Sequence, residues 1–256
     1  MADYTLIKVE KSPGRCDVIL NNPPLNILTI AMMEEICDAV NEAATDTGLR
    51  VLVFRSEGKH FSAGASVEEH TADKVEGMIA AFGHMFRCIS EVPAVTIAAV
   101  DGSVLGGGCE LATFCDMILA TDRAKFGQPE IQLGVFPPVA VVIFPYLLGR
   151  NRALELLLTG KVIPAAEAER IGLINHVYPA AEFQAKTEEF IAGLTALSAS
   201  ALAITKKITD QSIYLPVKEG LRQADETYLN ELMLTDDAHE GLAAFLEKRK
   251  PKWKNR

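Results

Sequence analysis

The stretch VTIAAVDGSVLGGGCELATF, residues 95–114, decides the fold. Its first six residues form a continuous apolar run, which is typical of a strand buried on both faces of a parallel sheet. A glycine-rich turn follows, and Gly107–Phe114 then has the pattern of a helix. A strand that passes through a short turn into a helix belongs to a βα unit, so this stretch predicts an α/β protein with parallel strands.

The same alternation extends upstream and downstream. The ranges 5–10 and 16–20 predict a β-hairpin around Pro13 and Gly14, and Thr29 is expected to cap a helix that ends near Ala44. Further strands are expected at 51–54 and 117–120, with a helix at 75–89 between the first of these and the stretch above. Beyond residue 120 strands become sparse, and helices are expected at 152–158, 165–171, 182–197, 217–233 and 236–250. We therefore divide the chain into a βα core at 1–195 and a C-terminal helical region at 196–256.

Composition and charge limit the classes of partner. The 256 residues are 49% hydrophobic and 23% charged, as in an ordinary globular protein with a large core. A formal net charge of −9 has the wrong sign for binding a phosphate backbone or an anionic membrane, so we expect no nucleic acid or membrane partner. The five cysteines form no C-x-x-C pair and predict reduced thiols. Together with an N-terminus that lacks a cationic region before an apolar one, they predict a cytoplasmic protein.

Common catalytic and cofactor motifs are missing from the sequence. There is no G-x-S-x-G elbow, H-E-x-x-H helix, Walker loop or EF-hand loop, and the five histidines lack metal-ligand spacing. The glycines at 106–108 follow a strand, but they do not match the G-x-G-x-x-G order of a dinucleotide site. We therefore expect neither a metal nor a redox cofactor.

Three short segments combine glycine with acidic or small residues at the ends of predicted strands, namely 59–66, 106–110 and 126–130. Glycines at a helix start leave amide N–H groups unobstructed, and the helix dipole favours an oxyanion there. Glu110 lies three residues after Gly107, on the same helix face, and its apolar neighbours predict a buried acid with a raised pKa. The alternatives are that the glycines only allow close packing, that Glu110 is a surface charge, and that Glu130 only favours a helix start.

In this order and spacing, the motifs Phe61-Ser-Ala-Gly-Ala, Gly106-Gly-Gly-Cys-Glu-Leu-Ala and Phe126-Gly-Gln-Pro-Glu-Ile resemble those of the crotonase, or enoyl-CoA hydratase/isomerase, superfamily. The resemblance implies a spiral of ββα units with a C-terminal helical region, and trimers or dimers of trimers. It implies a coenzyme A thioester as substrate, so that coenzyme A is not a separate cofactor. By motif position, the oxyanion hole is expected at Ala65 and Gly107, and the catalytic acids are expected to be Glu110 and Glu130.

Two details resemble a narrower branch, the cyclohexa-1,5-diene-1-carbonyl-CoA hydratases of anaerobic benzoyl-CoA degradation. Ser66 follows the oxyanion alanine where the family usually has aspartate, and Gly134-Val-Phe-Pro-Pro replaces a glycine-rich stretch. In that branch, water adds to the cyclic thioester to give 6-hydroxycyclohex-1-ene-1-carbonyl-CoA. The apolar run 135–139 is expected either to line a broad acyl pocket or to lead into a buried helix.

The resemblance also implies further substrate and coenzyme A contacts, at Ala63, Gly64, Ser66, Val67, Gly106, Phe136, Phe245 and Lys248. The last two belong to the C-terminal helix, either of the same chain or of a neighbouring subunit. For Lys248 the alternative is a solvated helix charge. Two other functions remain open. One is a linear-chain 2-enoyl-CoA hydratase of fatty-acid β-oxidation, and the other is an RNA-binding or noncatalytic scaffold, which the net charge of −9 disfavours.

Overall fold

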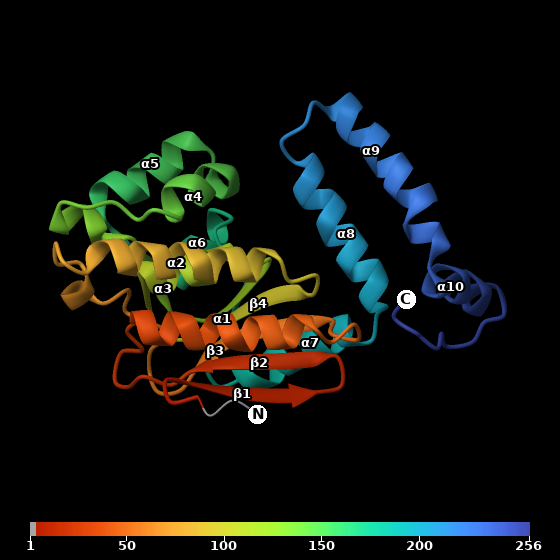
Figure 1. Ribbon diagram of the computed structural model, residues 1–256, viewed down its shortest axis with the longest axis horizontal. Coiled ribbons are helices and arrows are strands. Elements are labelled where there is room, and N and C mark those ends of the chain that lie inside the picture. Colours follow the sequence, from red (N-terminus) through yellow and green to blue (C-terminus); the bar gives the residue numbers. More distant parts are fainter. Residues whose placement is uncertain (1–3) are drawn as a thin grey trace.

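The computed structural model describes residues 4–256, and its centre is a six-stranded sheet in the order β1-β2-β3-β4-β6-β9 (Figure 1). Strands β1 and β2 form the antiparallel hairpin, and all later neighbours pair in parallel. A second sheet has the order β5-β7-β8. The strands are β1 (Ile7–Ser12), β2 (Arg15–Leu20), β3 (Val51–Ser56), β4 (Val95–Val100), β5 (Ser103–Leu105), β6 (Met117–Thr121), β7 (Lys125–Gly127), β8 (Val162–Pro164) and β9 (His176–Tyr178).

Helices cover both faces of the large sheet and fill the C-terminal part of the chain. The α-helices are α1 (Ile30–Ala44), α2 (Val75–Ser90), α3 (Gly107–Phe114), α4 (Ala140–Leu148), α5 (Arg150–Thr159), α6 (Ala165–Arg170), α7 (Phe183–Thr195), α8 (Ala199–Ser212), α9 (Val217–Asn230) and α10 (Asp236–Leu246). Three short 3-10 helices are η1 (Val67–Glu69), η2 (Pro129–Leu133) and η3 (Leu232–Leu234). The mixed α/β architecture is confirmed, and so is the cap of α1, where the Thr29 side chain accepts from the Met32 N–H.

The core has two parts, one on each side of the large sheet. Strand residues such as Leu52 and Phe54 pack with α1, α2 and α3 in the larger cluster. The alternate residues Val51 and Val53 pack against α7 on the other side. Successive side chains of a strand point to opposite faces, so a fully buried strand needs an unbroken apolar run.

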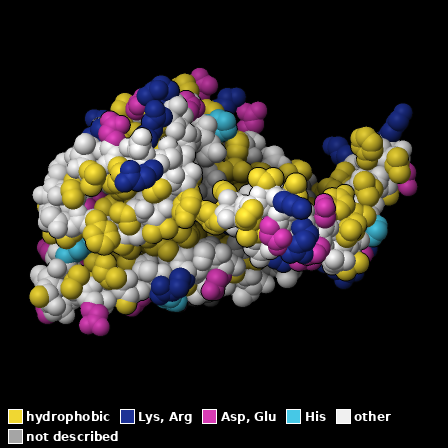
Figure 2. All heavy atoms as spheres, turned by 90° about the horizontal axis from the view of Figure 1, so that it is seen from above, with side chains coloured by type: hydrophobic (Ala, Val, Ile, Leu, Met, Phe, Trp, Pro, Cys, Tyr) yellow, Lys and Arg dark blue, Asp and Glu magenta, His cyan; other side chains and the backbone are white. Residues whose placement is uncertain are grey.

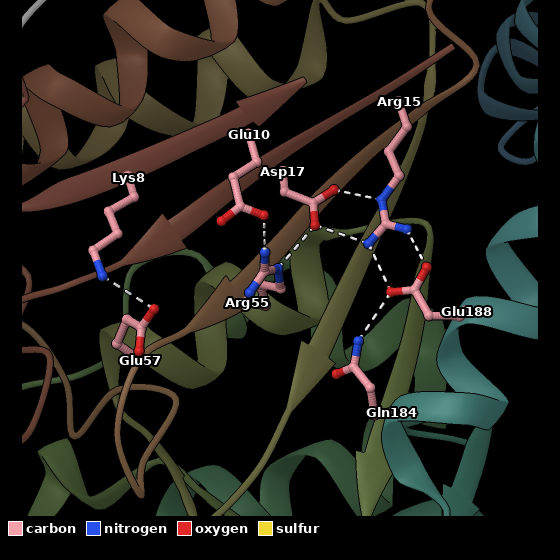
Figure 3. A network of polar contacts seen from close by, with 8 residues as sticks. All are labelled: Lys8, Glu10, Arg15, Asp17, Arg55, Glu57, Gln184 and Glu188. Carbon is pink, nitrogen blue, oxygen red and sulfur yellow. Dashed lines mark hydrogen bonds and ion pairs between the residues drawn. The ribbon is translucent and has the colours of Figure 1, made fainter. Parts of the chain in front are cut away.

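A polar network ties the hairpin to α7 (Figure 3). Asp17 in β2 is only 3% exposed, and both of its carboxylate oxygens accept bonds from guanidinium groups. Arg15 Nε lies 2.6 Å from Asp17 Oδ1, and Arg55 Nε lies 2.8 Å from Asp17 Oδ2. Arg15 also pairs with Glu188 of α7, so the buried charge is balanced by an ion-pair network that joins the sheet to a helix.

The last three helices form an arm beside the sheet, at the end opposite to α3, α4 and α5 (Figure 1). Hydrophobic side chains are visible over both the body and the arm in Figure 2. Exposed apolar residues of the arm include Val217, Leu221, Leu229, Phe245 and Leu246. Among the described residues, no single helix is long and apolar enough to cross a membrane; α7 and α8, which are bent by 96° at their junction, reach that length and apolarity together.

Two sequence expectations for the C-terminal part were wrong. Helix α8 was not expected, because its β-branched residues weaken a helical pattern. The last helix was expected to reach residue 250, but α10 ends at Leu246. Lys248 has a φ of 56°, and the Arg249 N–H donates to the Ala244 carbonyl at 3.0 Å, which is the bond of a Schellman ending. Lys248 is therefore a residue beyond the helix. The prediction about the N-terminal segment rests partly on residues 1–3, which lie outside the described residues.

Candidate active site

The extended segment around Ala65 aims one amide N–H at the start of α3. Ala65 forms a parallel bridge with Leu28, in which the Leu28 N–H donates to the Gly64 carbonyl and the Ser66 N–H donates to the Leu28 carbonyl, both at 2.9 Å. In an extended chain, alternate amides point to opposite sides. The Ala65 N–H therefore points away from Leu28, and no described residue accepts a hydrogen bond from it.

The other amide comes from the first residue of α3. Gly106 has a φ of 51° and a ψ of −131°, a conformation that is readily adopted only by glycine, and its N–H donates to the Gly127 carbonyl at 3.0 Å. A Cβ atom on Gly107 would lie 3.2 Å from the Ala65 nitrogen and 3.1 Å from Phe82 Cε2. The two amides are therefore neighbours, and a helix start leaves the Gly107 N–H without an intrahelical acceptor.

Glu110 is buried one turn into α3. Its side chain is 1% exposed, and Oε1 accepts from the N–H groups of Val139 at 2.6 Å and of Ala140 at 2.8 Å, at the start of α4. Burial outweighs these donors and raises the pKa of Glu110 to about 8, with a smaller contribution from the charge of Glu130. No described residue donates a hydrogen bond to Oε2, so this oxygen is free to hold a proton.

Glu130 lies half-buried in η2, directly after β7. Burial raises the pKa of its carboxyl group as well. A Cβ atom on Gly106 would lie 2.7 Å from Glu130 Oε1, so the carboxylate packs over the glycine that precedes the Gly107 amide. Gln128 is buried, and its side-chain amide faces Glu130 Oε2 and the Gly106 carbonyl, which are both acceptors. We therefore assign the amide nitrogen to this side, where it donates to each of the two oxygens at 3.2 Å. The two acids and the two amides thus gather around residues 106–107.

An apolar groove begins at Ile131, the residue that follows Glu130 in the chain. It has a volume of about 380 Å³ and is formed by η2, α4, α5 and the segment before α4. Its lining includes Ile131, Phe136, Pro137, Val141 and Leu157. The first two residues of the run 135–139 are exposed, with Phe136 at 65%, and burial begins only at Pro137.

The expected substrate contacts separate into two groups. Ala63, Gly64, Ser66 and Gly106 lie with the amides of Ala65 and Gly107, and Val67 is exposed just beyond them at the start of η1. The side chain of Phe245 in α10 is 82% exposed. Helix α10 lies at the other end of the molecule from α3, so one chain does not bring Phe245 or Lys248 to the two acids (Figure 1).

Three contributors to the site were missed from the sequence. Val139 was considered only as part of the apolar run 135–139 and Ala140 was given no role, yet their N–H groups hold Glu110. The signal for them was Pro137-Pro138 followed by an apolar run, because proline is favoured close to a helix start. Gln128 was quoted within a motif but given no role, and only its full burial beside Glu130 reveals one.

The family follows from a comparison of the whole sequence. The sequence profile of the enoyl-CoA hydratase/isomerase family matches residues 10–256. The chain belongs to this family. Solved structures of similar fold include an enoyl-CoA hydratase from Geobacillus kaustophilus, with a TM-score of 0.94 at 30% identity, covering 100% of this chain and 98% of that one. Another, from Bacillus anthracis, has a TM-score of 0.93 at 29% identity, covering 98% and 100%. The crotonase fold is thus confirmed.

Related sequences carry two kinds of name. A cyclohexa-1,5-dienecarbonyl-CoA hydratase from Thauera aromatica is 38% identical, over 93% of this chain and 92% of that protein. A probable enoyl-CoA hydratase from Mycobacterium bovis is 36% identical, over 99% of both. These relatives agree with membership of the enoyl-CoA hydratase/isomerase family. Because the chain is about equally identical to both relatives, the comparison does not separate cyclic from linear substrates.

Proposed function

We propose that this family member hydrates an acyl-CoA thioester whose carbonyl oxygen binds the N–H groups of Ala65 and Gly107. The supporting observation is the convergence of two available amides beside a buried acid and a half-buried acid. Addition of water to a conjugated thioester places negative charge on the carbonyl oxygen, and each fixed donor contributes about 3–4 kcal/mol to stabilising it.

Glu110 and Glu130 move the protons in this proposal. One carboxylate accepts a proton from water, and one neutral acid returns a proton to carbon, so the pair must hold one proton between them. Because the pKa of Glu110 is raised to about 8, that proton resides on Glu110 in the free chain near neutral pH. The chemistry as proposed uses no metal or redox cofactor, because the amides stabilise the charge and the acids supply the protons.

The substrate that we propose is cyclohexa-1,5-diene-1-carbonyl-CoA, hydrated to 6-hydroxycyclohex-1-ene-1-carbonyl-CoA. The name of the Thauera aromatica relative, Ser66 after the oxyanion alanine and the Gly134-Val-Phe-Pro-Pro segment support this choice. The apolar groove that begins at Ile131, the residue after Glu130, has a volume of about 380 Å³, which suits a cyclic acyl group. Water adds at the carbon β to the thioester, and the proton goes to the far end of the conjugated system.

A linear-chain 2-enoyl-CoA hydratase is the second candidate, because similar relatives carry that name. Turnover of the cyclic diene thioester and of crotonyl-CoA, with identification of the products, separates the two. We expect a higher kcat/KM for the cyclic substrate, and a preference for crotonyl-CoA would refute the narrower proposal.

A variant pair tests the acyl groove directly. Phe136→Ala removes a ring from the groove lining, whereas Val142→Ala removes a similarly exposed apolar side chain of α4 that does not line it. We expect Phe136→Ala to lower kcat/KM for the cyclic substrate more than for crotonyl-CoA, with no such difference for Val142→Ala. If Phe136→Ala lowered kcat/KM equally for both substrates, the groove would not be the binding site of the acyl group.

Assembly and location are also proposed. The exposed apolar side chains of α9 and α10 support a homo-oligomer, a trimer or a dimer of trimers, in which a neighbouring subunit's α10 brings Phe245 and Lys248 to coenzyme A. The net charge of −9 argues against nucleic acid and membrane partners. The free, buried thiols fit a reducing compartment, and we propose the cytoplasm.

A further inference from the structure

A second cluster of reactive side chains lies between α1 and α2, apart from the acids. Cys37 of α1 and Cys88 of α2 are buried, and their Sγ atoms are 2.8 Å apart. His84 is exposed, and its Nε2 lies 3.6 Å from Cys88 Sγ. The donor atoms of the three residues all lie within 4.8 Å of one another.

The spacing of these residues follows from the two helices. His84 and Cys88 are four residues apart in α2, so they share one face of that helix. Asn41 stands four residues after Cys37 in α1, and its Nδ2 lies 3.8 Å from Cys88 Sγ. The cluster therefore has a buried side with two thiols and an open side with an imidazole and an amide, through which an ion can enter.

We propose that Cys37, His84 and Cys88 form a zinc site that clamps α1 to α2. Two sulfur ligands and one imidazole nitrogen are a common zinc donor set, with bonds of about 2.3 Å to sulfur and 2.0–2.1 Å to nitrogen. In a tetrahedral site these bond lengths place sulfur and nitrogen about 3.6 Å apart, and two sulfurs about 3.8 Å apart. The His84 to Cys88 distance of 3.6 Å already fits, and the Cys37 sulfur needs to move outward by about 1 Å.

Charge and protons balance in this site. Burial and the Cys88 contact raise the pKa of Cys37 to about 12, so the free chain keeps this thiol protonated. Binding of Zn²⁺ replaces two thiol protons, which are released to solvent, and the product of one dication and two thiolates is neutral. A neutral complex suits a site whose sulfur ligands are buried. The nearest charges that affect Cys37 besides Cys88 are those of Asp38 and Arg87, of opposite sign.

The test is a titration of the full, reduced chain with Zn(II), followed by calorimetry in buffers of different ionisation heat. We expect one zinc ion to bind per chain with release of two protons. Cd(II) in place of zinc should produce a thiolate-to-metal charge-transfer band. His84→Ala should lower the affinity at least tenfold, since even loss of a residue that only supports a ligand costs about 10–100-fold. Cys37→Ser should at least halve the cadmium band, because it removes one of the two sulfur ligands.

Matched variants make the test specific. His239→Ala removes another exposed imidazole, and Cys16→Ser changes a buried thiol in β2; both should bind zinc like the parent chain. Because the His84 side chain is exposed, His84→Ala tests the site without disturbing the core. Zinc binding that His84→Ala and Cys37→Ser leave unchanged would overturn the proposal. The proposal would also be overturned if mass spectrometry of the protein showed a mass two hydrogens lower, with Cys37 and Cys88 linked in one peptide. The pair would then be a disulfide.

Discussion

Replacing Gln128 with methionine should shift the pH dependence of turnover. The variant keeps the length of the buried side chain but removes the N–H that donates to Glu130 Oε2 at 3.2 Å. A hydrogen bond to a charged group contributes about 1.5–3 kcal/mol, and at this length we take the lower end of that range. Since one pKa unit corresponds to about 1.36 kcal/mol, the pKa of Glu130 should rise by about one unit.

The assay is kcat/KM for the acyl-CoA substrate across the pH range. Turnover needs one proton on the acid pair, so protonation of Glu130 as well forms the acid limb of the profile. We expect Gln128→Met to move that limb upward by about one unit. Gln132→Met, an exposed glutamine in the same η2 segment, should leave it in place. An unshifted acid limb in the Gln128 variant, at unchanged thermal stability, would refute the assignment of Gln128 as a positioning residue.

Three further predictions concern the acid pair and Gly106, which packs against Glu130. Glu110→Gln keeps an oxygen that can accept from Val139 and Ala140, and Glu130→Gln is equally conservative. Each should therefore lower kcat about 10²–10⁴-fold while thioester binding, measured by calorimetry, survives. Turnover of the parent chain should fall as pH rises through about 8, where Glu110 loses its proton; a flat alkaline limb in stopped-flow rates would contradict this. Gly106→Ala should cost about 1–3 kcal/mol of backbone strain, and its Cβ would meet Glu130 Oε1, so thermal melts should show a lower Tm.

The βα core was predictable because its local and tertiary signals agree. The hairpin around Gly14 and the helix capped by Thr29 each combine a periodic pattern with a residue that favours the boundary. The strand Val95–Val100 is a mostly apolar run that ends at a glycine-rich turn. Strands β5, β7 and β8 are each three residues long, too short for any periodicity to develop. Helix α8 was missed because its β-branched residues oppose its helical form, which tertiary contacts then stabilise.

The sequence motifs predicted which backbone amides and which acid would lie in the site. The glycines at the start of α3 indicated an unobstructed amide, and the structure leaves the Gly107 N–H in that state, whereas the Gly106 N–H donates to the Gly127 carbonyl. The apolar neighbours of Glu110 indicated its burial, which the structure confirms. The partners of Glu110 were not predictable, because Val139 and Ala140 contribute main-chain N–H groups that any residue except proline would supply. The catalytic roles stay predictions until the variants are measured.

The anchoring of Glu110 at the start of α4 links two properties of the enzyme that are usually treated separately. Residues 136 and 137 line the groove that we propose for the acyl group, and the chain then supplies the two N–H groups that hold Glu110 only a few positions later. Any change of this segment that reshapes the groove for another acyl chain also alters how firmly the acid keeps its proton. Attempts to widen the substrate range at this point should therefore change the pH optimum at the same time.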